Sequence, residues 1–250
     1  MSKRQAAAAV QSRIGACLLS WACLCGPAWA AHPLQTEDTG TQGTGNIEIE
    51  NGLAWTRANG ATVFVYQPQL SYGLTPELDL IAQPSWVRQP DGRGLGNTNL
   101  DFKWRFFGSA PWSLGIRAGA ALPGEARFGL PHGTASAHGL LVATYDEAPL
   151  TIHTNLGPER NPAAAGIRRT VGHVSTAVMW AASERLIWTV DASAGADPDP
   201  KRKAWPATLL AGVIYTITPG LDADLGYQVS ANARPQARQL LMGLTYRFAP

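Results

Sequence analysis

Cysteine is almost missing from this 250-residue chain. Its three cysteines, Cys17, Cys23 and Cys25, all lie close to the N-terminus. The rest of the chain therefore has no disulfide, no thiolate metal ligand and no cysteine nucleophile. That absence is notable if the chain is exported, because an oxidising compartment would allow disulfides to form.

Charge is scarce as well, since only 15% of the residues are charged. The formal net charge of +2 includes Lys3, Arg4 and Arg13; without these three, 17 Lys and Arg face 18 Asp and Glu. The chain also lacks a basic cluster, so its composition gives no support for nucleic-acid binding. A long hydrophobic helix is missing too, because Pro206 and the turn 218–220 interrupt the uncharged stretch 204–221.

The first 30 residues have the features of an export signal. Basic residues precede an apolar stretch at 14–25, and Ala28-Trp29-Ala30 forms a small-residue cleavage site. We therefore expect residues 1–30 to be a removable signal peptide. Ile14-Gly15-Ala16-Cys17 loosely resembles a lipoprotein cleavage site, but cutting there would leave almost no apolar segment before the cut.

Residues 31–45 are polar and glycine-rich, and neither a helical nor a strand periodicity runs through them. We expect an irregular arm, which either hangs free or folds into the interior of the domain that follows, residues 46–250. His32, Glu37 and Asp38 are candidate metal ligands in this arm. Nothing in the sequence fixes their geometry, so we expect them to be solvated and to hold no metal.

Strand-like alternation begins after the arm and is clearest in the stretch 99–107. Leu100, Phe102, Trp104 and Phe106 alternate there with Asp101, Lys103 and Arg105, so that one strand face is apolar and the other charged. The same pattern predicts twelve strands, at 47–56, 62–72, 77–87, 98–107, 112–122, 134–145, 150–157, 170–182, 186–195, 207–217, 221–229 and 239–248.

These segments predict an all-β fold, a transmembrane antiparallel up-and-down β-barrel of about twelve strands. Each segment has about the length of a tilted membrane-crossing strand, and their number is even. Short turns follow the even segments and mostly longer loops follow the odd ones, including a loop at 88–97. Aromatic residues gather near segment ends, where membrane interfaces would lie. A soluble exported sandwich is disfavoured because its tryptophans would be scattered over a wet surface.

In a barrel that spans lipid, the apolar face must point outward and the charged face must line the lumen. Asn51 breaks this pattern, since it falls on the apolar face of the first strand and suggests a bulge or a shifted boundary. The candidate pore-lining residues are Asp101, Lys103, Arg105, Arg117, His153, His173, Asp191 and Asp224.

A catalytic alternative comes from His173-Val174-Ser175, whose His-x-Ser spacing occurs in outer-membrane phospholipase and lipid A deacylase barrels. The predicted face of these two residues is lumenal, away from lipid, and no acidic partner is evident. Ser136-Ala137-His138 has the reverse order and is a weaker candidate. We expect polar lumen residues and no enzyme activity at either place. The sequence also carries no phosphate loop, dinucleotide fingerprint or nucleophile elbow, and we expect no cofactor.

Three stretches resemble a known family: His32 to Gly43, Gly94 to Phe106 and Trp205 to Gly212. They are similar to the outer-membrane transporter family named after the MetA pathway of phenol degradation. The resemblance implies a Gram-negative outer-membrane barrel for uptake of aromatic or other hydrophobic compounds, and it supplies no catalytic residues.

The last strand resembles the signal that the outer-membrane assembly machinery reads, although Ala249-Pro250 follows its aromatic Phe248. The expected partners are outer-membrane lipid and lipopolysaccharide, this machinery and a small-molecule solute. The expected function is passive passage of the solute through the lumen. A barrel filled by its own side chains, without transport, is the structural alternative.

Overall fold

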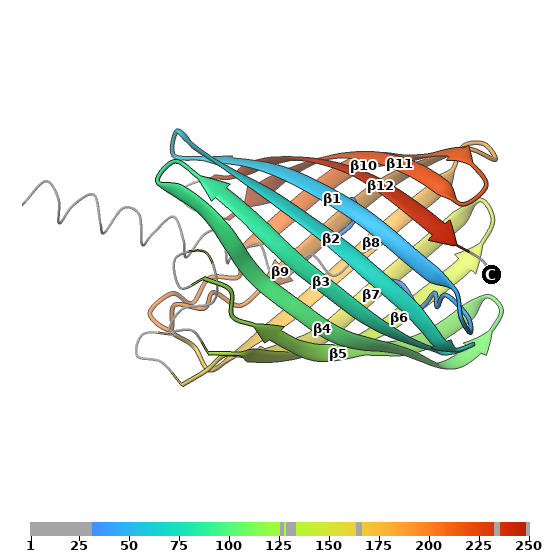
Figure 1. Cartoon of the computed structure of the whole chain (residues 1–250), viewed down its shortest axis with the longest axis horizontal. Helices are drawn as coiled ribbons and strands as arrows, with labels where there is room; N and C mark the ends of the chain where they lie inside the picture. Colours follow the sequence, from blue (N-terminus) through green and yellow to red (C-terminus); the bar gives the residue numbers. More distant parts are fainter. Residues whose placement is uncertain (1–31, 126–127, 129–133, 164–166, 233–235, 249–250) are drawn as a thin grey trace, which may run out of the picture.

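A computed structural model describes residues 32–125, 128, 134–163, 167–232 and 236–248. The predicted signal peptide, 1–30, and the C-terminal Ala249-Pro250 lie outside this description. The described residues form twelve strands in one closed antiparallel barrel, and β12 pairs with β1 to close it (Figure 1). The predicted fold class is therefore confirmed. No helix in the described ranges is long and apolar enough to cross a membrane.

The strands follow the chain around the barrel, each beside its neighbours in sequence. Their bounds are β1 Ile47–Ala58, β2 Ala61–Thr75, β3 Leu78–Gln89, β4 Gly92–Ser109, β5 Trp112–Leu122, β6 Ser136–Glu147, β7 Leu150–Arg160, β8 Thr170–Ala181, β9 Leu186–Gly195, β10 Ala207–Thr218, β11 Leu221–Ala231 and β12 Arg238–Phe248.

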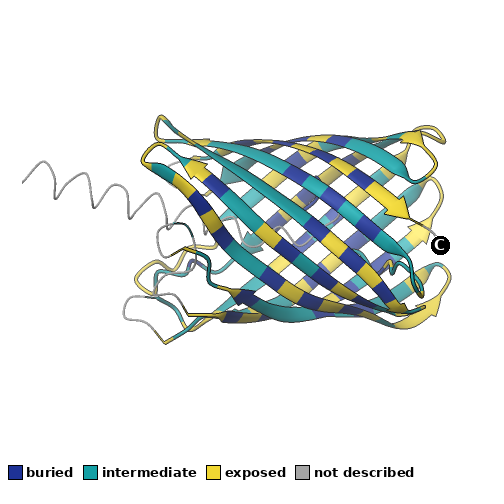
Figure 2. Ribbon diagram, in the orientation of Figure 1, coloured by how far each residue is buried: buried dark blue, intermediate teal, exposed yellow. Residues whose placement is uncertain are grey.

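More and less buried positions alternate over stretches of the strands, as the two-residue period requires (Figure 2). On β4, Leu100, Phe102 and Trp104 are exposed on the outside, while Asp101 and Lys103 are buried inside. A closed barrel pairs its backbone groups between strands, so its outer face can be apolar without leaving a polar edge. The apolar exterior and polar interior are those of a barrel whose surroundings are lipid.

The two ends of the barrel differ. At one end, here called the arm end, β1 begins, β12 ends and the strands are joined by short turns such as 76–77 and 110–111. At the opposite end, here called the loop end, lie the long connections 123–135, 161–169 and 196–206.

The predicted long loop at 88–97 is wrong. β3 continues to Gln89 and β4 starts at Gly92, so a two-residue turn joins them. The glycines of this stretch, Gly94 and Gly96, sit in strand β4. A Cβ at Gly94 would lie 2.6 Å from Glu125 Oε2, and one at Gly96 would lie 2.3 Å from Ser85 Oγ. Glycine is needed here because other side chains already fill the interior, not because the chain turns.

Asn51 does lie on the outer face, but no bulge explains it. β1 pairs without a register shift with both β2 and β12. Tyr66 on the neighbouring strand donates its hydroxyl hydrogen to Asn51 Oδ1, at 2.9 Å. The outward amide thus has a local partner. Register shifts occur instead between residues 73 and 75, 84 and 86, 105 and 107, and 216 and 218.

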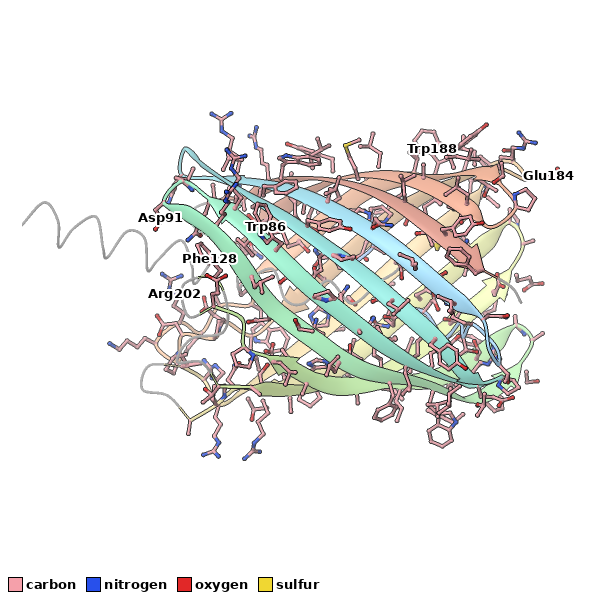
Figure 3. All side chains as sticks on the ribbon, in the orientation of Figure 1. Trp86, Asp91, Phe128, Glu184, Trp188 and Arg202 are labelled. Carbon is pink, nitrogen blue, oxygen red and sulfur yellow. The ribbon has the colours of Figure 1, made fainter. Side chains whose placement is uncertain are left out.

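Aromatic side chains form two outward bands, one near each end. Trp112 and Tyr145 lie 4.9 Å apart, ring centre to ring centre, near the arm end. Trp55, Phe64 and Trp86 form a chain of ring contacts toward the loop end, at 5.2 and 6.4 Å. Figure 3 shows Trp86 and Trp188 toward opposite ends of the barrel. Such bands are typical of the two membrane interfaces of a spanning barrel.

Candidate functional site

The N-terminal arm lies inside the barrel. It enters at the arm end and extends to the middle of the strands. There the His32 ring lies against Gly52 of β1 and Gly243 of β12. Thr36 and Glu37 are only 1% and 2% exposed. Of the two alternatives open to the arm, the structure shows the folded one. The expectation that its charged residues are solvated is wrong for Glu37.

Glycines in the wall make room for the tip of the arm. Gly52 pairs with Gly243, and Gly212 pairs with Gly226, across neighbouring strands. A Cβ at Gly243 would lie 2.5 Å from His32 Nδ1, and one at Gly226 would lie 2.8 Å from Pro33 Cβ. Both distances are shorter than any van der Waals contact, so side chains at these two positions would displace the arm tip.

The arm has no strand partner along most of its length, and lumenal side chains take over that role. Asp191 Oδ2 accepts hydrogen bonds from the amides of Gln35 and Thr36, each at 2.8 Å. Asn155 accepts from the Glu37 amide at 2.6 Å and donates back to its carbonyl at 2.8 Å. Buried backbone groups require such partners, so the wall is complementary to this particular path of the arm.

The same principle holds where the arm enters. The Gln42 amide donates to both oxygens of Asp79 at 3.1 Å, and its side chain donates to Glu48 at 2.8 Å. The Gly45 amide then donates to the carbonyl of Gly73 at 2.8 Å. The arm is held at this end by side-chain and backbone contacts together.

Glu37 is the centre of a buried ionic network. Its Oε1 lies 3.1 Å from Lys103 Nζ, and its Oε2 accepts a hydrogen bond from Arg117. Arg117 also pairs with Asp101 at 2.9 Å, and Lys103 lies 3.5 Å from Asp38. Charges in the interior are tolerated only when paired and hydrogen-bonded. The arm carboxylate supplies that pairing to two cations of the wall.

The network continues into the wall on both sides of Arg117. Gln69 accepts a hydrogen bond from Arg117 Nη2 at 3.1 Å. His138 Nε2 lies 2.7 Å from Asp101 Oδ1. Gln69 also donates to Glu50, which in turn accepts the His32 amide at 3.0 Å. The central cations are therefore connected with the arm tip through hydrogen-bonded wall residues.

His32 anchors the tip of the arm. Its Nδ1 lies 2.5 Å from Asp224 Oδ1, and the Asp224 side chain is almost fully buried. Leu34 provides the apolar part of the anchor, because it packs with Ala177, Leu210 and Leu241 in a buried cluster. Pro33, packed against Gly226, adds a second apolar contact, and the other arm contacts described above are polar.

The structure places most of the predicted pore-lining residues around the arm. Lys103, Arg117, Asp191 and Asp224 contact it directly. Asp101 and His153 are buried one contact further away; His153 Nδ1 lies 2.9 Å from Thr144 Oγ1, which accepts the Thr39 amide. Their role in lining a conducting pore stays a prediction.

The other two predicted residues lie outside the central network. Arg105 is half-buried near the arm end, where its Nη2 donates to the carbonyl of Pro76 at 3.2 Å; Thr41 of the arm donates to the same carbonyl at 2.8 Å. His173 is half-buried toward the loop end of β8. The charged face of strand β4 thus runs from the central network to the barrel rim.

Sequence reasoning missed three residues of the network. Asn155 is fully buried and binds the arm through both atoms of its amide, yet it was not among the candidates. Its place on the inward face of an alternating segment could have indicated it. Gln69 also lies on the inward face of an alternating segment. Glu37 was considered only as a solvated candidate metal ligand, because the arm has no periodicity from which the direction of its side chain could be deduced.

The geometry does not assemble a hydrolase at His173 and Ser175. Ser175 Oγ donates to Asn155 Oδ1 at 3.4 Å, and among the described residues no hydrogen bond links it with His173. Both residues face the interior on β8. In the same described ranges, no three His, Cys, Asp or Glu side chains come together as a possible metal site.

Comparison with known proteins shows the fold. The chain matches no protein-family model and no curated protein. An outer-membrane channel from Pseudomonas putida F1 has a TM-score of 0.68 and 11% identity, covering 84% of this chain and 98% of its own. The NanC porin has a TM-score of 0.65 and 8% identity, covering 79% and 98%. The KdgM porin, solved with disordered oligogalacturonate, has a TM-score of 0.60 and 8% identity, covering 81% and 99%.

The chain is therefore a twelve-stranded antiparallel barrel with the fold of outer-membrane channels, and its interior holds its own N-terminal arm. At identities of 8 to 11% the likeness concerns the fold alone. The resemblance to the family named after the MetA pathway stays a prediction.

Proposed function

We propose that this protein is a passive channel of the Gram-negative outer membrane, and that its N-terminal arm occludes the lumen until it is displaced. The observation that carries the proposal is the polar attachment of the arm to the inner wall, centred on Glu37 between Lys103 and Arg117. The short turns at the arm end would face the periplasm and the long loops the outside, as in bacterial barrels of this kind.

The nature of the contacts supports a removable arm. A filled structural barrel needs an interior of interlocking apolar or permanently paired side chains. Here the arm contributes two buried apolar side chains, Pro33 and Leu34, of which a leucine is worth about 1.5 to 3 kcal/mol of apolar burial, and otherwise mainly hydrogen bonds and ion pairs. Water entering the lumen would solvate those same groups, so the net free energy that holds the arm is much smaller than the number of contacts suggests.

The part of the wall that the displaced arm would uncover indicates the chemical class of the solute. Displacement would uncover Ala177, Leu210 and Leu241, a small apolar surface, within an otherwise polar and charged lining. We infer a small organic solute with an apolar part, which agrees with the uptake of aromatic or hydrophobic compounds implied by the family resemblance. Its polar groups would exchange water for the carboxylates, amides and hydroxyls of the wall.

The test is solute flux through the purified, refolded protein, with and without residues 31–45. We expect low conductance in planar bilayers and slow liposome swelling with the mature chain, and a clear increase in both after deletion. Barrel folding is checked separately by heat-modifiable migration on gels. A folded barrel that passes nothing in either form would reject the channel and favour the side-chain-filled alternative.

A further inference from the structure

Four arginines lie on the outward face at the loop end, in two directly opposed pairs. Arg57 on β1 is the cross-strand partner of Arg238 on β12. Arg88 on β3 is the partner of Arg93 on β4. All four side chains are exposed. We name these four residues the arginine rim patch.

The pairing is electrostatically unfavourable as it stands. Directly opposed side chains in an antiparallel pair have Cβ atoms about 5 Å apart, and like charges at that distance destabilise the sheet. No Asp or Glu occurs between residues 51 and 76 or between 225 and 250, the stretches around Arg57 and Arg238. Asp91, in the turn between β3 and β4, brings one carboxylate to the other pair. The patch therefore carries an excess of positive charge.

Apolar side chains lie directly beside each arginine on the membrane side. Trp55 and Trp86 precede Arg57 and Arg88 by two residues, and Leu95 and Leu240 follow Arg93 and Arg238 by two. Residues two positions apart on a strand lie on the same face. Each apolar residue is therefore about 7 Å from its arginine along the strand, on the side nearer the middle of the membrane. Each arginine thus lies just beyond an apolar residue of the outer wall.

Aromatic packing marks this level as a membrane interface. Trp55 contacts Phe64, and Phe64 contacts Trp86, across three neighbouring strands. Aromatic belts lie where the hydrocarbon ends and the polar headgroups begin. The guanidinium groups one step further out are therefore at headgroup depth.

We propose that the arginine rim patch binds the phosphate groups of lipopolysaccharide in the outer leaflet. Guanidinium groups suit phosphate because they form paired, charge-assisted hydrogen bonds with its oxygens. The centres of the two arginine pairs lie about three strand spacings apart, roughly 14 Å, and their nearest members, Arg57 and Arg88, about two. Two phosphate groups on one lipid headgroup can therefore each meet a pair. Bound phosphate removes the repulsion within both pairs, while Trp55, Trp86, Leu95 and Leu240 contact the acyl chains.

This inference rests on the proposed function for the orientation of the barrel alone, since the loop end must face the outer leaflet. It does not depend on the arm or on solute passage. Lipid binding and solute flux are measured separately, so either result can fail without the other.

The test measures binding of purified lipid A to the folded, detergent-solubilised full mature chain, by native mass spectrometry and by titration. The variant replaces the patch, Arg57→Gln, Arg88→Gln, Arg93→Gln and Arg238→Gln. Its matched control replaces four exposed cations elsewhere at the loop end, Arg160→Gln, Arg169→Gln, Lys201→Gln and Lys203→Gln. Both variants lose four positive charges, so a difference between them reports position rather than net charge.

We expect the patch variant to bind lipid A at least about tenfold more weakly than the parent chain, and the control to change by no more than about twofold. Lipid A without its phosphates should bind the parent as weakly as intact lipid A binds the patch variant. Equal losses in both variants, or equal binding of dephosphorylated lipid A, would overturn the proposal. Inorganic phosphate that binds as tightly as lipid A would replace the lipid assignment by a free-anion site. Heat-modifiable migration on gels shows that the variants are folded.

Discussion

Glu37 of the arm and Arg117 of β5 form an ion pair in which both side chains are almost completely buried, at 3% and 0% exposed. The two residues are 80 positions apart in sequence. Each also has a second charged partner, Lys103 for Glu37 and Asp101 for Arg117. Within this network, removing one charge leaves an opposite charge buried without its full set of partners.

Glu37→Gln should therefore release the arm. The change leaves Lys103 and Arg117 close together without the carboxylate that separates them, a loss of about 3 to 5 kcal/mol when one partner of a buried pair is removed. We expect a higher conductance in planar bilayers and faster proteolysis within residues 32–45. Thr44→Ala, at an exposed position of the same arm, is the control and should change neither. Conductance equal to that of the parent chain would show that the ion pair does not hold the occluded state.

Gly226→Ala should displace the arm tip without touching the ionic network. The new Cβ would lie 2.8 Å from Pro33 Cβ, and β11 cannot move because it is paired on both sides. We expect partial opening, seen as a higher conductance, with the barrel still heat-modifiable. Gly108→Ala is the matched control, because a Cβ there meets nothing within 4 Å. A closed channel with an unchanged arm would mean that the close approach at Gly226 is relieved in another way.

The arm-deleted channel should prefer cations at neutral pH. The buried carboxylates of the wall outnumber its two central cations, Lys103 and Arg117. The six carboxylates are those of Glu48, Glu50, Asp79, Asp101, Asp191 and Asp224. Once water fills the lumen, the excess of carboxylates over these two cations attracts cations and repels anions. Reversal potentials in a potassium chloride gradient measure this directly. A preference for chloride at pH 7 would contradict the assignment of these carboxylates to the conducting lumen.

Lys103→Gln, made in the arm-deleted chain, should increase the cation preference further, because it removes one of the two central positive charges. Arg105→Gln removes the same charge near the arm end and is the control. We expect the central change to have the larger effect, since Lys103 is buried inside the barrel whereas Arg105 lies near the rim, where bulk water and salt screen its charge more strongly. Equal shifts of the reversal potential in both variants would indicate that ion selectivity depends only on the total charge of the lumen.

Ser175→Ala tests the hydrolase alternative. Ser175 Oγ donates its hydrogen bond to Asn155 rather than to His173. We therefore expect neither the parent chain nor the variant to hydrolyse phospholipid or lipid A. Turnover of either lipid by the parent, abolished in a variant with an intact barrel, would establish an enzyme instead.

The sequence predicted the barrel well because a closed sheet repeats one local rule. Alternation such as Leu100, Asp101, Phe102, Lys103 assigns each side chain to a face, and ten-residue segments set the span. The rule failed at residues 88–97, which were expected to form a loop but belong mostly to β3 and β4; Gly94 and Gly96 there make room for other side chains inside the barrel. It also overinterpreted Asn51, whose outward amide needs only the nearby Tyr66 hydroxyl.

The arm could not be placed from the sequence for a different reason. Many of its contacts join residues far apart in sequence, some by more than a hundred positions, as between Glu37 and Asn155 or Gln35 and Asp191. They are polar contacts of an irregular segment, so no periodicity indicates a buried face. The inward side of the wall was predictable, but the segment that fills it was not.

The most direct measurement of the central claim is a reversible crosslink between arm and wall. Thr39 Oγ1 and Ser113 Oγ lie 2.5 Å apart, so Thr39→Cys with Ser113→Cys brings two sulfur atoms within reach of a disulfide. The chain after residue 30 has no other cysteine to compete. Made in the Glu37→Gln chain, whose arm should be released, the oxidised channel should stay at the low conductance of the parent chain, and reductant added to the same bilayer should raise it. A conductance that is already high in the oxidised form would contradict the account, because solutes would then pass with the arm fixed in the lumen.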